Sequence, residues 1–460
     1  MSVLTFRRRL ACLVLLVGLI SGPGRVLASE VYLTPDPLLI RAQEFEKERH
    51  WLDACRCYDE LLHKERDRSE YRLGYQRCLR HYYLSRRQRD TAYHQALAKL
   101  TPGQALDVYE QVLSAVGVAY VDRPRVDIAT LFQNGVHELE LALDEKTFLQ
   151  TYLPDAEAKP RALLSFRAAL ADWHTRKVTN RVEARDGVLS VARAAHDAGL
   201  TSKQSLLVPA FALEFACGCC NALDEYTLFV TPGSEPGQRS KPATSIRHDM
   251  LTDNLSTTPG GPPIFAGLIT VSQFQESTPQ EMREAVFDLI AHGAKGLILD
   301  VRGNPGGLFK AAVQVAEQFV GEGVIVYSEG QIKEYNHPFE ARGGHVCQLP
   351  IIILVDGETA SAAEVLAGAL KELGRARLIG QQTYGKGSIQ AVIPIDKPPL
   401  DKTPAAIRLT VARLLSPAKQ PYSGRGVTPD VEVQPGDDAL DAAKIHLRPL
   451  LNPMPMARPG

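Results

Sequence analysis

The chain has 460 residues, of which 45% are hydrophobic, and its 52 lysines and arginines nearly balance its 53 aspartates and glutamates. This length corresponds to about three domains, and the apolar content suffices for conventional hydrophobic cores. With a net charge of −1, the chain has no excess of basic residues that could bind a phosphate backbone, so no nucleic-acid partner is predicted. The composition also argues against a disordered chain and a membrane bundle.

Residues 1–28 have the pattern of a secretory signal peptide. Three arginines from Arg7 to Arg9 precede an apolar run from Leu10 to Ile20, and Ala28 stands at the expected cleavage position. The apolar run is shorter than the ~20 residues that a membrane-spanning helix needs. We therefore expect a periplasmic or secreted protein that contacts a membrane only if this segment stays uncleaved.

Removal of the signal peptide leaves an odd number of cysteines, so at least one thiol is free or pairs between chains. Three of them, Cys217, Cys219 and Cys220, cluster in an apolar helical stretch without the companion ligands of a metal site. We predict buried small residues or a disulfide at this cluster, and no metal or cofactor. The seven cysteines are Cys55, Cys57, Cys78, Cys217, Cys219, Cys220 and Cys347.

The first part of the mature chain, residues 29–101, is predicted to be helical. From Pro35 to about Leu100, apolar residues recur at three- and four-residue spacings, which indicates two amphipathic helices and a turn. Residues 42–62 resemble the first part of a tetratricopeptide repeat, although an ordinary helical hairpin explains the same pattern. A second helical part is predicted at 102–232.

A connector and an α/β segment are predicted to follow. Residues 233–263 are rich in glycine, proline, serine and threonine, which is typical of an exposed linker. Over residues 264–437, strand and helix patterns alternate, which indicates an α/β layer with a largely parallel sheet. Residues 438–460 are expected to form a C-terminal tail that is loose from His446 onward.

Three loops follow buried strands of the α/β segment, where such sheets usually place their sites. The first, residues 300–307, reads DVRGNPGG, and its glycines allow the backbone to approach a ligand closely. The second loop brings Ser361 to the start of an apolar helix. Ser361 could simply cap this helix, or it could attack a substrate, because the unpaired N–H of Ala362 would stabilise the resulting anion.

The third loop, residues 380–390, contains the sequence TYGKGSIQ. Its GxxxxGK spacing nearly matches a phosphate-binding P-loop. However, Gly387 stands where magnesium binding needs a hydroxyl group, and the residues that follow alternate like a strand instead of opening a helix. A nucleotide-binding site is therefore not predicted here.

Together, the phrases DVRGNPGG, TASAAEVLAGAL and TYGKGSIQ resemble the motifs of the C-terminal processing peptidases, also called tail-specific serine proteases, in order and in separation. The resemblance is strong from about Ile264 to Val433. It implies an α/β fold with a ClpP/crotonase-like serine peptidase core, preceded here by an N-terminal all-helical region. Most family members carry a PDZ domain before the core, and residues 233–263 are too few for one.

The resemblance also implies a role for each matching residue. Ser361 matches the nucleophile, Lys386 the general base and Gln390 the residue that holds the lysine. The backbone donors of the oxyanion hole are implied to be Ala362 and Gly307, or Gly306 in place of Gly307. A lysine acts as a base only when neutral, so its pKa must fall from ~10.4 toward ~7–8, as desolvation in an apolar pocket can achieve.

The function implied is that of an exported serine endopeptidase, which hydrolyses protein or peptide substrates through a Ser-Lys dyad and an acyl-enzyme intermediate. We further hypothesise that the N-terminal helices contact the substrate or an adaptor protein. The alternative is a catalytically inactive scaffold that binds peptides with a peptidase-like fold, because one fold hosts varied chemistry.

Overall fold

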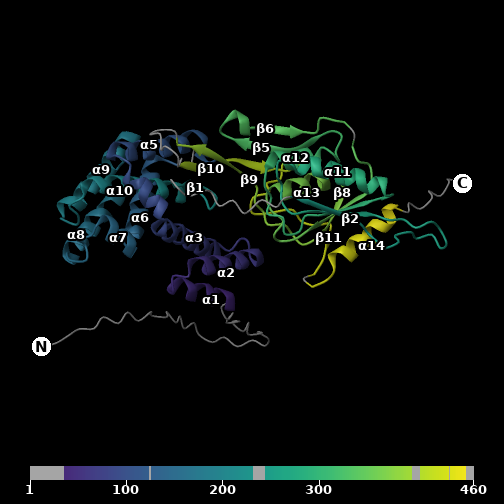
Figure 1. Ribbon diagram of the computed structural model, residues 1–460, viewed down its shortest axis with the longest axis horizontal. Helices are drawn as coiled ribbons and strands as arrows, with labels where there is room; N and C mark the ends of the chain where they lie inside the picture. Colours follow the sequence, from purple (N-terminus) through teal and green to yellow (C-terminus); the bar gives the residue numbers. More distant parts are fainter. Residues whose placement is uncertain are drawn as a thin grey trace, which may run out of the picture.

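The computed structural model describes residues 36–123, 126–231, 244–344, 346–395, 405–434 and 436–451. The predicted signal peptide lies outside these residues. Within the described part of the chain, no helix is long and apolar enough to cross a membrane. A helical half and an α/β half lie next to each other, and strands β9 and β10 run between them (Figure 1).

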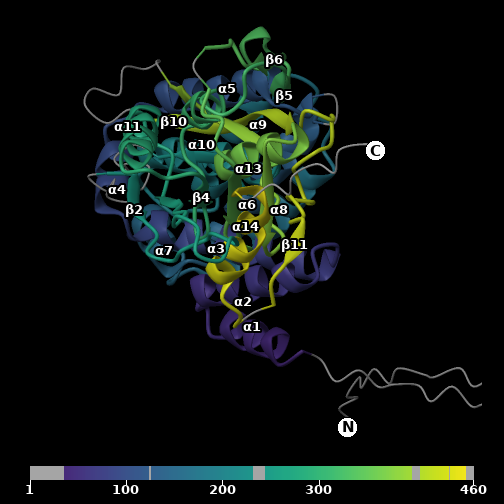
Figure 2. The same cartoon turned by 90° about the vertical axis from the view of Figure 1, so that its right-hand side faces the viewer.

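The helical half contains ten α-helices among the described residues. Four of them lie where the sequence predicts two. One of the additional boundaries is at Asp90, which ends α3 and starts α4 by accepting hydrogen bonds from the N–H groups of Ala92 and Tyr93. Figure 2 shows α1 and α2 below the rest of the molecule. The helices are α1 (Pro37–Lys47), α2 (Trp51–Lys64), α3 (Ser69–Arg89), α4 (Thr91–Ala98), α5 (Pro102–Ala119), α6 (Ile128–Ala142), α7 (Lys146–Tyr152), α8 (Pro160–Ala171), α9 (Arg181–Asp197) and α10 (Gln204–Asn221).

Helix α10 forms the centre of this half, and the cysteine cluster belongs to it. A Cβ atom added at Gly218 would lie 2.4 Å from the backbone oxygen of Asn134 in α6, so the two helices pack almost backbone to backbone. Only small side chains fit such an interface, which accounts for the buried Cys217, Cys219 and Cys220. All seven described cysteines are free, so the cluster consists of buried small residues and not of a disulfide.

A buried cluster of charges joins α3 to the centre of the helical half. The guanidinium of Arg87 donates to Glu214 at 2.5 Å and to Glu138 at 3.1 Å, and all three side chains are buried. Arg80 donates to the second oxygen of Glu138 at 2.6 Å. These pairs fix the position of α3 relative to α6 and α10, because an unpaired charge would be costly to bury.

The α/β half is built on a six-stranded sheet of order β11-β8-β7-β4-β3-β2, in which all neighbours are parallel except β2 and β3. Helices α11, α12 and α13 pack on one face, and α14 packs on the other. The elements are β2 (Ile246–Met250), β3 (Gly267–Val271), α11 (Thr278–Ala291), β4 (Leu297–Asp300), α12 (Phe309–Ala316), β7 (Ile351–Val355), α13 (Ala362–Glu372), β8 (Ala376–Gly380), β11 (Val431–Glu432) and α14 (Ala439–Leu451).

Two predictions at the edges of this half are wrong. Strand β2 lies within the predicted linker 233–263, where it pairs with β3 and buries Ile246. Residues 446–451 of the predicted loose tail are not loose, because they belong to α14, which continues to Leu451 and buries Ala443 and Leu447 against the sheet. Residues 232–243 and 452–460 lie outside the described part of the chain.

A second, five-stranded sheet departs from the predicted parallel arrangement, because all its pairs are antiparallel. Ile407, Leu409 and Val411 of β10 belong to the core of the helical half, whereas Leu414 of the same strand belongs to the core of the α/β half. Strand β10 therefore ties the halves together. The strands are β1 (Leu228–Val230), β5 (Val324–Gly330), β6 (His337–Glu340), β9 (Ser388–Pro394) and β10 (Ala406–Leu415).

We expect the change Arg87→Ala to lower the free energy of unfolding by about 3–5 kcal/mol, because it leaves the buried carboxylates of Glu138 and Glu214 without their shared partner. Urea unfolding followed by circular dichroism measures this change. The matched control is Arg86→Ala, which removes an exposed arginine from the same helix. Equal midpoints for the two variants would contradict the stabilising role of the buried cluster.

Candidate active site

The three predicted loops meet at one edge of the six-stranded sheet, because they follow the neighbouring parallel strands β4, β7 and β8. Backbone hydrogen bonds join the loops to one another. The N–H of Ala360 in the second loop donates to Asn304 of the first at 2.9 Å, and the N–H of Tyr384 in the third donates to Thr359 of the second at 2.9 Å. The structure thus assembles the three motifs into one site.

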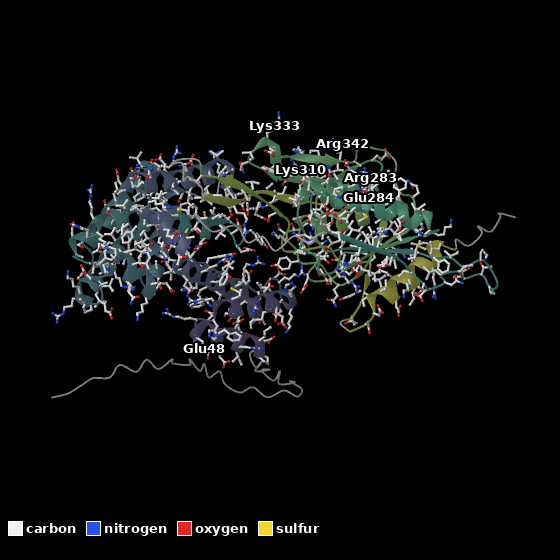
Figure 3. The ribbon with its side chains drawn as sticks, in the orientation of Figure 1. Glu48, Arg283, Glu284, Lys310, Lys333 and Arg342 are labelled. Atoms are coloured by element: carbon white, nitrogen blue, oxygen red, sulfur yellow. The ribbon has the colours of Figure 1, made fainter. Side chains whose placement is uncertain are left out.

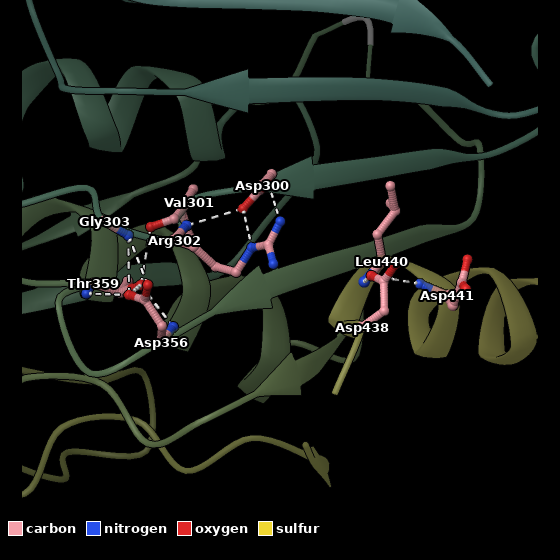
Figure 4. A network of polar contacts seen from close by, with 9 residues as sticks. All are labelled: Asp300, Val301, Arg302, Gly303, Asp356, Thr359, Asp438, Leu440 and Asp441. Carbon is pink, nitrogen blue, oxygen red and sulfur yellow. Dashed lines mark hydrogen bonds and ion pairs between the residues drawn. The ribbon is translucent and has the colours of Figure 1, made fainter. Parts of the chain in front are cut away.

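Asp356 holds the first loop against the second (Figure 4). Its carboxylate accepts hydrogen bonds from the N–H groups of Gly303 at 3.0 Å and Thr359 at 2.9 Å. Beside it, the carboxylate of Asp300 pairs with the guanidinium of Arg302 at 2.7 Å. These contacts are structural, because they satisfy the polar groups of a tight loop and leave Ser361 uninvolved.

Ser361 stands directly before α13 with a positive φ of 56°, a conformation that costs a residue with a side chain about 1–3 kcal/mol. The first loop passes very close to it. A Cβ atom added at Gly306 would lie 2.8 Å from Cβ of Ser361 and 3.0 Å from the nitrogen of Ala362, so only glycine fits there. Strain of this kind typically accompanies functional residues.

Two backbone donors beside Ser361 are free. The N–H of Gly306 donates to Oδ1 of Asn304 at 2.8 Å and is therefore occupied. By contrast, within the described residues the N–H groups of Gly307 and Ala362 have no hydrogen-bond partner. Of the two glycines considered from the sequence, Gly307 is thus the one with a donor available to a substrate oxygen.

Lys386 lies in the third loop, with Nζ 4.8 Å from the centre of the Tyr226 ring. Burial lowers the pKa of its ammonium group below the ordinary lysine value, and the positive charge of Arg408 acts in the same direction. The negative charges of Glu364, Asp224 and Glu225 oppose this shift without reversing it. The surroundings of Lys386 therefore favour the neutral amine, which is the form that accepts a proton.

The fully buried carboxylate of Glu364, in the first turn of α13, links the predicted nucleophile to the predicted base. Its Oε2 accepts from the backbone N–H of Ser361 at 2.7 Å and from that of Lys386 at 2.8 Å. Its Oε1 accepts from Thr383 Oγ1 at 2.5 Å and from the N–H of Gly385 at 2.7 Å. Burial raises the pKa of Glu364, whereas these four donors stabilise its charged form.

Gln390 lies on β9, and its hydrogen bonds do not involve Lys386. Its Nε2 donates to Ser388 Oγ at 2.8 Å and to Thr410 Oγ1 at 3.5 Å. Among the described residues, no hydrogen bond joins Gln390 to the lysine. The role of holding Lys386 therefore stays a prediction for this residue.

Two contributors to this site were not predicted. Glu364 gives a recognisable signal, because it is a single charged residue within the apolar helix AAEVLAGAL. Arg66 gives no recognisable signal in the sequence, because it reaches the third loop from the α2–α3 turn, more than 300 residues earlier in the chain. A cavity of about 130 Å³ lies where this turn meets the loop, lined in part by Arg66, Tyr226 and Gly385.

Comparison with known proteins agrees with the three motifs. Residues 266–433 match the model of peptidase family S41. The chain is 37% identical over 173 residues to a carboxy-terminal-processing protease from Bartonella bacilliformis and 37% identical over 168 residues to a carboxyl-terminal-processing protease from Synechocystis. Each alignment covers 36% of this chain and 38% of the relative. The family match confirms the resemblance inferred for this segment.

Part of the chain is also similar to solved structures. The structure of a photosystem II D1 C-terminal processing protease is 31% identical, with a TM-score of 0.38. The match covers 45% of this chain and 53% of that chain.

We expect Glu364→Gln to loosen both loops, because an amide nitrogen would then face two of the four donors and leave them unpaired. The expected loss in the free energy of unfolding is about 3 kcal/mol. Hydrogen exchange measured by mass spectrometry should become faster in peptides that contain Ser361 and Lys386. The control is Glu358→Gln, an exposed residue of the second loop. Unchanged exchange in the Glu364 variant would show that this carboxylate does not hold the loops.

Proposed function

We propose that the protein, whose residues 266–433 match the model of peptidase family S41, is an exported serine endopeptidase with Ser361 as nucleophile and Lys386 as general base. The observation that carries the proposal is the carboxylate of Glu364, which binds the backbone of both residues through one oxygen. The strained backbone of Ser361 and the lowered pKa of Lys386 support the same assignment. The substrates are proposed to be proteins or peptides.

The first half of the proposed reaction forms an acyl-enzyme. As Ser361 Oγ bonds to the carbonyl carbon of the substrate, its proton passes to the neutral Nζ of Lys386. The negative charge that develops on the carbonyl oxygen is stabilised by the free N–H groups of Gly307 and Ala362. When the carbon–nitrogen bond breaks, the ammonium of Lys386 returns the proton to the departing amine, and an ester to Ser361 remains.

The second half of the reaction hydrolyses this ester. Lys386, neutral again, takes a proton from a water molecule whose oxygen attacks the ester carbon. The bond to Ser361 Oγ then breaks, and the serine oxygen regains a proton from Lys386. The products are a carboxylic acid and an amine, and neither a metal nor a cofactor takes part in any of these proposed steps.

We expect Ser361→Ala and Lys386→Ala each to reduce kcat/KM by roughly 10⁴-fold or more, because nucleophile and base act as a unit. Cleavage of unfolded casein and of a short fluorogenic peptide measures this loss. The control is Lys310→Ala, because Lys310 is an exposed residue, labelled with Lys333 and Arg342 at the upper side of the view in Figure 3. A wild-type protein as inactive as the Ser361 variant would instead favour the peptide-binding scaffold.

The pH dependence of kcat should show the titration of Lys386. Only the neutral amine accepts the serine proton, so the rate should rise as the pH increases through the pKa of Lys386. Because burial lowers this pKa, the midpoint should lie below the ordinary lysine value of about 10.4. Stopped-flow acylation rates with an ester substrate measure this profile. A rate that falls as the pH increases over this range would be inconsistent with a lysine base.

A further inference from the structure

Arg66, in the turn between α2 and α3, grips the backbone of the third loop. Its Nη2 donates to the carbonyl oxygen of Thr383 at 2.5 Å, and its Nη1 donates to those of Tyr384 at 3.1 Å and Arg425 at 3.2 Å. A guanidinium is suited to such a task, because its planar fork presents several donors in fixed directions. One side chain of the helical half thus binds the backbone of Thr383 and Tyr384, which precede Lys386 in the third loop.

Helix α2 makes three further contacts with the same site. The Nε2 of His63 lies 3.1 Å from the carbonyl oxygen of Gly357 in the second loop, and the His63 ring packs edge-to-face with Tyr384 at 5.2 Å. The hydroxyl of Tyr384 donates to Oδ1 of Asp59 at 3.3 Å. The helical half therefore contacts both the loop that carries Ser361 and the loop that carries Lys386.

The third loop is held from two sides. Glu364 binds the hydroxyl of Thr383 from within the α/β core, and Arg66 binds the carbonyl of the same residue from the helical half. Arg66 is close enough for the negative charge of Glu364 to raise the pKa of its guanidinium, against the effect of burial. The opposite charges of Arg66 and Glu364 thus favour the arrangement in which the loop lies between them.

We infer that Arg66 is a positioning residue for the Ser361–Lys386 pair, so that the helices of residues 36–100 form part of the catalytic unit. This inference rests on the proposed peptidase function. Arg66 would act through the backbone of Thr383 and Tyr384, which it holds so that Lys386 stays in its buried position beside Tyr226. The hypothesis of an adaptor or substrate contact differs, because it predicts a defect for protein substrates only.

The test compares Arg66→Ala with Arg68→Ala in the full chain. Arg68 is exposed and lies in the same turn, where its guanidinium pairs with Glu65 and lies over the Tyr71 ring, so its removal makes the same change of charge without touching the third loop. Arg66→Ala should lower kcat by ~10²-fold for a short peptide and for casein alike, because small displacements of a reacting group are costly. KM should change little, since the arginine does not contact the substrate.

Two further measurements separate positioning from a general loss of structure. A looser loop exposes Lys386 to water, which raises the pKa of its ammonium, so the alkaline midpoint of the rate should move to higher pH in Arg66→Ala. Millimolar guanidinium chloride should restore part of kcat, whereas sodium chloride should not. If Arg66→Ala does not fold, Arg66→Lys replaces it, because lysine keeps the charge and lacks the planar fork.

The outcomes are distinguishable. Wild-type kcat and an unchanged pH profile in the Arg66 variant, with Ser361→Ala inactive, would overturn the inference and leave the proposed function intact. A loss for casein with normal cleavage of the short peptide would also overturn it, in favour of the adaptor hypothesis. Full activity in Ser361→Ala would overturn the proposed function and the inference together.

Discussion

A single buried carboxylate organises the site of this protein. Glu364 has four hydrogen-bond positions, and the chain fills all of them with donors from the two loops that carry Ser361 and Lys386. Because a buried charge is stable only when its donors stay in place, the carboxylate and the loops fix one another. The relative position of the Ser361 and Lys386 backbones follows from this constraint, which explains how two short loops keep one arrangement without a covalent link.

Much of the α/β half could be predicted from the sequence, because each loop follows a short apolar strand and parallel strands end at a common edge. This rule alone places Ser361 and Lys386 near each other. The second sheet was not predictable in the same way, since an isolated strand such as β10 shows its apolar pattern but not its partners. A pattern of period two cannot tell a parallel from an antiparallel neighbour.

The remaining parts of the site depend on contacts between distant residues, which leave weak marks in a sequence. Glu364 is visible as a charge in an apolar helix, although its four partners are not. Arg66 binds carbonyl oxygens, which every residue possesses, so nothing in the acceptor sequence reveals the contact. The predicted loose tail was misjudged for a similar reason, because α14 owes its stability to packing on the sheet and not to its own sequence.

The contact of the α2–α3 turn with the third loop has a consequence for the order in which the chain folds. Arg66 leaves the ribosome early, but its acceptor at Arg425 is made 359 residues later. Contacts of such separation form slowly, since a long loop must close before they contribute any stability. The nascent protein therefore cannot complete the contacts of Arg66 until residue 425 has been synthesised, so the third loop stays without its support from the α2–α3 turn until that point.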